Sequence, residues 1–132
     1  DMNRILTEGT LTANELSIIV LTVARHWSAE YPWAVQVRNA LKVGLGQNVI
    51  DAINGRTALP TEDAREMLVH KLANELLAYQ GLSDASYAEA EAAFTTDELI
   101  TVIARIGAFS MTCCTANGFD ITPPDEVPAR LQ

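Results

Sequence analysis

The sequence predicts an all-helical (all-α) domain, a compact bundle of five or six helices with no sheet. Two segments, Thr12–Glu15 and Thr95–Glu98, have the Thr-x-x-Glu pattern of a capping box, and each precedes an apolar stretch. Apolar residues recur at three- and four-residue spacing over residues 67–77 and 99–111, as on one face of a helix. No segment alternates apolar and polar side chains with the period of two that a half-buried strand requires.

The first predicted helix follows the capping box at Thr12, whose hydroxyl can accept from the third helical amide while Glu15 bonds back to the cap. The run after it is apolar on nearly every side, which is typical of a helix buried in a core: Leu16, Ile18, Ile19, Val20, Leu21, Val23 and Ala24. Its β-branched residues leave a buried strand as the alternative, but the capping box and the length favour a helix.

A break over residues 27–30 precedes a second helix with Pro32 in its first turn, where the missing amide costs nothing. This helix is expected to stop at Gly44. A short third helix is predicted over residues 47–54, closed by Gly55.

Thr61 is the predicted N-cap of a long fourth helix that ends at Gly81. Glu62 and Asp63 suit its positive end. Its expected core stripe comprises Met67, Leu68, Leu72, Leu76 and Leu77. His70 lies on a charged face of the same helix and is expected to be solvated.

Ser83 caps the next predicted helix, and Thr95 opens the last one, which is expected to end at Asn117-Gly118. The expected apolar residues of the last helix are Leu99, Ile103, Ile106 and Met111. Residues 1–120 therefore form one helical domain, and residues 121–132, which contain three prolines, form an extended tail.

The net charge is −8, and more than half of the carboxylates lie between Glu62 and Glu98. Such a surface repels a phosphate backbone, so we expect no nucleic-acid partner. No apolar run approaches the ~20 residues that span a bilayer, and no basic amphipathic helix is present, so no membrane association is expected. The apolar fraction of 48% favours further burial between subunits in a homo-oligomer.

The two cysteines, Cys113 and Cys114, are neighbours, which disfavours a disulfide between them. We expect them to be small core residues in a reducing compartment, and the protein to be cytoplasmic.

A resemblance to a known family rests on residues 16–45. A buried helix is followed by Ala24-Arg25-His26-Trp27, then by the fairly specific turn Glu30-Tyr31-Pro32-Trp33, then by an amphipathic helix that ends Leu41-Lys42-Val43-Gly44-Leu45. Over roughly residues 12–120 the chain resembles the carboxymuconolactone decarboxylase / alkylhydroperoxidase D family. The resemblance implies an orthogonal helical bundle of the alkylhydroperoxidase D-like (AhpD-like) type and a trimer or a multiple of three. Family members often have further helical residues upstream, which leaves open an N-terminal portion before Asp1.

The redox branch of this family uses a Glu, two Cys and a His, with the cysteines at a helix N-terminus that stabilises a thiolate. Anchored on Glu30-Tyr31, those four positions hold Ser17, Ala29, Pro32 and Gln36 in this chain. No cysteine precedes Cys113, so no shift of the alignment supplies a thiol. The resemblance therefore implies a lyase of the decarboxylase type, acting on a lactone of aromatic catabolism, rather than a thiol peroxidase.

The same turn supplies the candidate site. A helix N-terminus beside a histidine and a carboxylate can bind a small organic acid or lactone and move a proton, so His26 and Glu30 are the catalytic candidates. The substrate-binding candidates are Tyr31, Trp33 and Gln36. No cofactor and no metal are expected, because no ligand set or phosphate loop is present.

Each candidate also has a structural interpretation. His26 can satisfy the carbonyls at a helix end, and the two aromatic residues of the turn can be core or interface anchors. Three hypotheses follow: a cofactor-free acid–base enzyme, a redox-dead relative that binds a small molecule or partner without turnover, and, least favoured, a peroxidase that uses Cys113 and Cys114. A turn packed solid by Trp27 and Trp33 would favour the second.

Overall fold

The computed structural model describes residues 11–123 and 130–132. The first ten residues of the predicted domain, and residues 124–129 of the predicted tail, lie outside the described residues. The described part contains no strand and six α-helices, which confirms the all-helical prediction: α2 (Ala13–Trp27), α3 (Glu30–Lys42), α4 (Gln47–Gly55), α5 (Ala64–Tyr79), α6 (Asp84–Ala93) and α7 (Thr96–Gly118).

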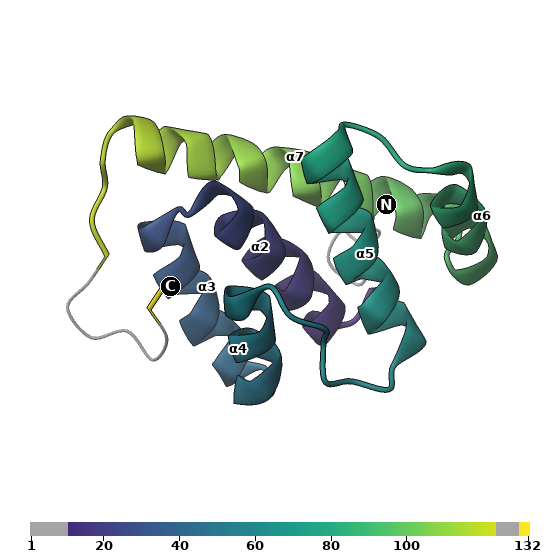
Figure 1. Cartoon of the computed structure of the whole chain (residues 1–132), viewed down its shortest axis with the longest axis horizontal. Coiled ribbons are helices and arrows are strands. Elements are labelled where there is room, and N and C mark those ends of the chain that lie inside the picture. Colours follow the sequence, from purple (N-terminus) through teal and green to yellow (C-terminus); the bar gives the residue numbers. More distant parts are fainter. Residues whose placement is uncertain (1–10, 124–129) are drawn as a thin grey trace.

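Helix α2 is the centre of the bundle. It contacts α3, α4, α5 and α7, with α7 lying across one side of it and α5 across another (Figure 1). Every residue from Ile18 to Ala24 is buried, so the apolar run is the core helix that the sequence predicted and not a strand. The capping box is present, with the amide of Glu15 donating to Thr12 Oγ1 at 3.0 Å and the amide of Thr12 donating to Glu15 Oε1 at 2.9 Å.

Both predicted ends of α5 are wrong by one or two residues. Helix α5 is capped by Asp63 and not by Thr61, because the Asp63 carboxylate accepts hydrogen bonds from two first-turn amides. Its left-handed C-cap is Gln80, with φ 60°, and not Gly81. Helix α7 ends at Gly118, as predicted, but the left-handed residue that follows it is Asp120 and not Gly118. The left-handed conformation costs a non-glycine residue only about 1–2 kcal/mol, which packing can outweigh.

The core stripes predicted for α5 and α7 each include residues that the structure exposes. Met67 of α5 is half exposed, and Ile103 and Met111 of α7 point to solvent. The buried apolar residues of α7 are Leu99, Val102, Ile106, Cys113 and Ala116. Helix α7 is apolar on both faces, so the sequence pattern alone could not tell which face meets the core.

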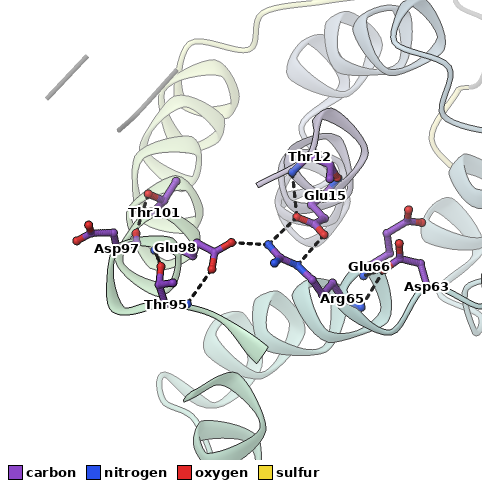
Figure 2. Close-up of polar contacts among 9 residues, drawn as sticks. All are labelled: Thr12, Glu15, Asp63, Arg65, Glu66, Thr95, Asp97, Glu98 and Thr101. Atoms are coloured by element: carbon purple, nitrogen blue, oxygen red, sulfur yellow. Dashed lines mark hydrogen bonds and ion pairs between the residues drawn. The ribbon is translucent and has the colours of Figure 1, made fainter. Parts of the chain in front are cut away.

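One arginine joins the first turns of three helices. The guanidinium of Arg65 on α5 lies between Glu15 of α2 and Glu98 of α7 (Figure 2). Its Nε is 3.0 Å from Glu15 Oε2, and its Nη2 is 2.7 Å from Glu98 Oε2. Arg65 also lies over the ring of Phe94, 4.6 Å from its centroid. Both glutamates are the closing residues of the capping boxes, so one cation holds two buried helix starts together.

Candidate functional site

A cavity of about 240 Å³ lies between the C-terminal half of α2, the end of α4 and the middle of α5. Its lining residues are Thr22, Arg25, His26, Ile53, Arg56, His70 and Asn74. We call it the His26 pocket. Four of these side chains are arginine or histidine, and no described lining residue carries a carboxylate. In a chain of net charge −8, this is a local concentration of cationic and titratable groups suited to an anion.

Both arginines of the pocket are held by the backbone of their neighbours. Arg25 donates from Nε to the carbonyl of Asn54 at 2.7 Å and from Nη1 to Ser28 Oγ at 3.2 Å. Arg56 is the left-handed C-cap of α4, with φ 56°, and its Nη2 donates to the carbonyl of Arg25 at 3.4 Å. The two guanidinium groups therefore enter the pocket from α2 and α4, in positions set by the ends of these helices.

The two histidines of the pocket favour their neutral forms. Burial lowers the pKa of His26, and the positive charge of Arg56 lowers it further. Burial alone lowers the pKa of His70. The Nε2 atom of His70 is 3.1 Å from the Nδ2 atom of Asn74, one turn away on α5. With the asparagine amide as donor, Nε2 of His70 is the acceptor and Nδ1 carries the proton. Both imidazoles can thus accept a proton near neutral pH.

The structure separates the five residues that the sequence singled out. Only His26 lines the pocket; Glu30 is exposed and borders a small hollow beside Trp33. Tyr31 lies at an apolar groove against the C-terminal half of α7. Trp33 is a core residue with 1% of its surface exposed, and Gln36 is half-buried and lines none of these hollows.

His70 is the site residue that sequence reasoning missed, because it was expected to be solvated. The structure places it partly buried, facing the end of α2. The available signal was the spacing of His70 and Asn74, which puts two polar side chains on one face of α5.

The turn over residues 29–33 corresponds to the turn that carries the redox chemistry in the family that the sequence resembles. Three of its residues are buried in the core of this chain. Ala29 is fully buried, Pro32 is buried, and Trp33 fills the core beside them. Trp27, by contrast, is 37% exposed and has its ring edge-on to His26, with centroids 5.5 Å apart. The turn is therefore packed by one of the two tryptophans, and the open space lies beside it, in the His26 pocket.

The cysteines lie on α7, where Cys113 is a core residue as predicted, whereas Cys114 is exposed and the prediction is wrong for it. Burial raises the pKa of the Cys113 thiol to about 12, so it stays protonated, while Cys114 is exposed. We therefore expect no thiol-dependent peroxide reduction. The measurement is peroxide consumption with a dithiol donor, for the wild type and for a Cys113→Ser/Cys114→Ser double variant. Turnover that disappears in the double variant would contradict the expectation.

Among the described residues, no group of three or more His, Cys, Asp or Glu side chains has the arrangement of a metal site. No protein-family model matches the sequence, and no curated protein matches it. A crystal structure of a protein of unknown function from Agrobacterium tumefaciens, provisionally described as the antioxidant defence protein AhpD, matches with a TM-score of 0.82. The likeness covers 95% of this chain and 87% of that chain, at 18% sequence identity. The fold is therefore AhpD-like. At this identity the likeness shows the fold of the AhpD-like bundle alone, and the activity has to be argued from the site.

Proposed function

We propose that this AhpD-like protein is a cofactor-free enzyme that moves a proton on a small organic acid or lactone bound in the His26 pocket. The observation that carries the proposal is the pairing of two imidazoles of lowered pKa with two arginines in one cavity. The site keeps His26 from the sequence prediction and replaces Glu30 by His70 as its second titratable group.

The chemistry follows from the two kinds of group. Guanidinium groups bind carboxylates through charge-assisted hydrogen bonds, so Arg25 and Arg56 would hold the acid. A bound carboxylate favours the protonated form of a nearby imidazole, so substrate binding would draw a proton from water onto His26 or His70. In a decarboxylation the bond to the leaving carboxylate breaks, CO2 departs and the electron pair stays on the substrate as an enolate. The imidazolium then gives its proton to carbon, and the guanidinium groups stabilise the enolate oxygen.

The test compares substitutions in the pocket with one at the start of α3. We expect His26→Gln and His70→Gln each to lower turnover of a carboxylate-bearing γ-lactone by about 10²–10⁴-fold, the usual cost of a lost general acid or base. Glu30→Gln is the control and should leave turnover unchanged, since Glu30 does not line the pocket. If Glu30→Gln lost turnover while His70→Gln kept the wild-type turnover, the site would instead lie at the start of α3.

The second candidate is a homologue that binds a small organic acid in the same pocket without turning it over. The packed turn at Ala29, Pro32 and Trp33 favours it, because the position of the family's chemistry is filled by core side chains. Binding of succinate that depends on Arg25 and Arg56, with no product formed from succinate or from carboxylate-bearing γ-lactones, would support this candidate over the enzyme.

We also propose that the protein is a homo-oligomer, a trimer or a multiple of three, assembled through the outer face of α7. The support is the exposure of large apolar side chains there: Ile100, Ile103 and Met111, with Phe119 and Ile121 just beyond the helix. In the described part of the chain α7 is the one helix long and apolar enough to cross a membrane by length and composition, so the prediction that no apolar run approaches this length is wrong for α7. Its inner face packs on α2, and the exposed apolar outer face supports the proposal of a protein partner there.

A further inference from the structure

The side chain of Asn54, at the end of α4, bonds to the backbone of a segment far away in the sequence. Its Nδ2 donates to the carbonyl of Arg130 at 2.7 Å, and its Oδ1 accepts from the amide of Gln132 at 3.2 Å. The amide of Asn54 therefore pairs with the backbone groups on either side of Leu131, as a neighbouring strand would. Only 4% of Asn54 is exposed, and a buried amide is costly without partners, so residues 130–132 satisfy a group that α4 alone leaves unpaired.

Leu131 anchors the same segment through apolar contact. It is partly buried against the main hydrophobic core and borders the small hollow beside Trp33 and Ala34 of α3. Residues 130–132 thus lie between α3 and α4, with their backbone bonded to Asn54 and one leucine side chain packed inward. Figure 1 shows this end of the chain beside α3 and α4.

The backbone of Asn54 is also bonded to a lining residue of the His26 pocket. Its own carbonyl accepts the 2.7 Å hydrogen bond from Nε of Arg25, and the next residue but one is Arg56. Both pocket arginines are therefore held at the last turn of α4, whose buried side-chain amide is satisfied by residues 130–132.

We propose that Asn54 is a positioning residue that couples the docking of residues 130–132 to the arrangement of Arg25 and Arg56. The docked segment holds the last turn of α4, and this turn holds the guanidinium of Arg25 in the pocket. When the segment leaves, the side-chain amide of Asn54 loses both of its hydrogen-bond partners. The hydrogen bond from Arg25 to the carbonyl of Asn54 then weakens, and the pocket binds carboxylates less tightly. The effect on ligand binding rests on the proposed function, whereas the docking and its effect on Arg25 do not.

The experiment uses Leu131→Asp, which places a charge against the core and should release the segment. Arg130→Ala is the matched control, because it keeps the backbone carbonyl that Asn54 bonds. Nuclear magnetic resonance gives two readouts that need no ligand: hydrogen exchange of the Gln132 amide and of the Arg25 Nε–H. Both should exchange at least ~10-fold faster in Leu131→Asp and at the wild-type rate in Arg130→Ala and Leu131→Met.

The third readout is the Kd of succinate, measured from the imidazole signals of His26 and His70. It should rise about 3–30-fold in Leu131→Asp, the range typical of coupling between linked sites. A Gln132 amide that exchanges at the rate of a free chain in the wild type would refute the docking. A released Gln132 amide with unchanged exchange at Arg25 would refute the coupling. If the wild type binds no succinate, the proposed function fails, and the coupling is still decided by the exchange at Arg25.

Discussion

Replacement of Arg65 by methionine is expected to lower the free energy of unfolding by about 3 kcal/mol, the lower end of the range for breaking a buried ion pair. The loss arises because Glu15 and Glu98 are only 1% and 5% exposed and would face each other without a cation (Figure 2). Arg65 itself is partly exposed, so water can take over some of its role, which is why the lower end applies.

Chemical denaturation measures this loss, with Lys71→Met as the matched control. Lys71 is also on α5 and pairs with Glu89 at 2.9 Å, but both side chains are exposed, so its removal should change stability little. Equal losses in the two variants would contradict the burial argument.

The pKa of Glu98 is lowered by its hydrogen bonds to Thr95 and Arg65, against the effect of burial. Its stabilising contribution is therefore present above the unfolded value of about 4.3 and is lost as the pH falls below it.

The combined substitution Ile103→Glu/Met111→Glu is expected to convert the proposed oligomer to a monomer of 14.3 kDa. Both side chains are exposed on the outer face of α7, 43% and 68% respectively, and two carboxylates there would repel their copies across an apolar interface. Light scattering at micromolar concentration gives the mass.

Met67→Glu is the control for this variant, because Met67 is an exposed methionine on a different helix, α5. It should leave the mass unchanged. A wild type of 14.3 kDa would contradict the assembly, and a double variant with the wild-type mass would show that another surface holds the copies together.

Much of the fold could be predicted from the sequence because its signals are local. The capping boxes at Thr12 and Thr95 and the cap at Ser83 involve residues only three apart, and all three are present. What the sequence could not show is the choice between alternatives of nearly equal local energy. Gln80 and Gly81 could each take the left-handed position, and the structure has it at Gln80.

Contacts between residues that lie far apart in the sequence could not be predicted either. Both capping glutamates were identified, but nothing in the sequence indicated that Arg65, 50 residues after Glu15, would bridge them. The same limit applies to the site. His26 was identified at a helix end, whereas His70 comes to face it only because α5 packs along α2. The position of Asn54 between two segments of the chain has no sequence signal at all.

We propose that a small carboxylate binds between Arg25, Arg56 and the two imidazoles. The most direct test of this proposal is a titration of the protein, with its histidines isotopically labelled, by succinate, following the imidazole signals of His26 and His70 against pH. The pKa of each free imidazole should lie below the usual 6.5, and saturation with succinate should raise both, because the bound anion favours the protonated rings. Arg56→Gln should abolish the rise. Succinate that leaves both imidazole pKa values unchanged at saturating concentration would contradict the account.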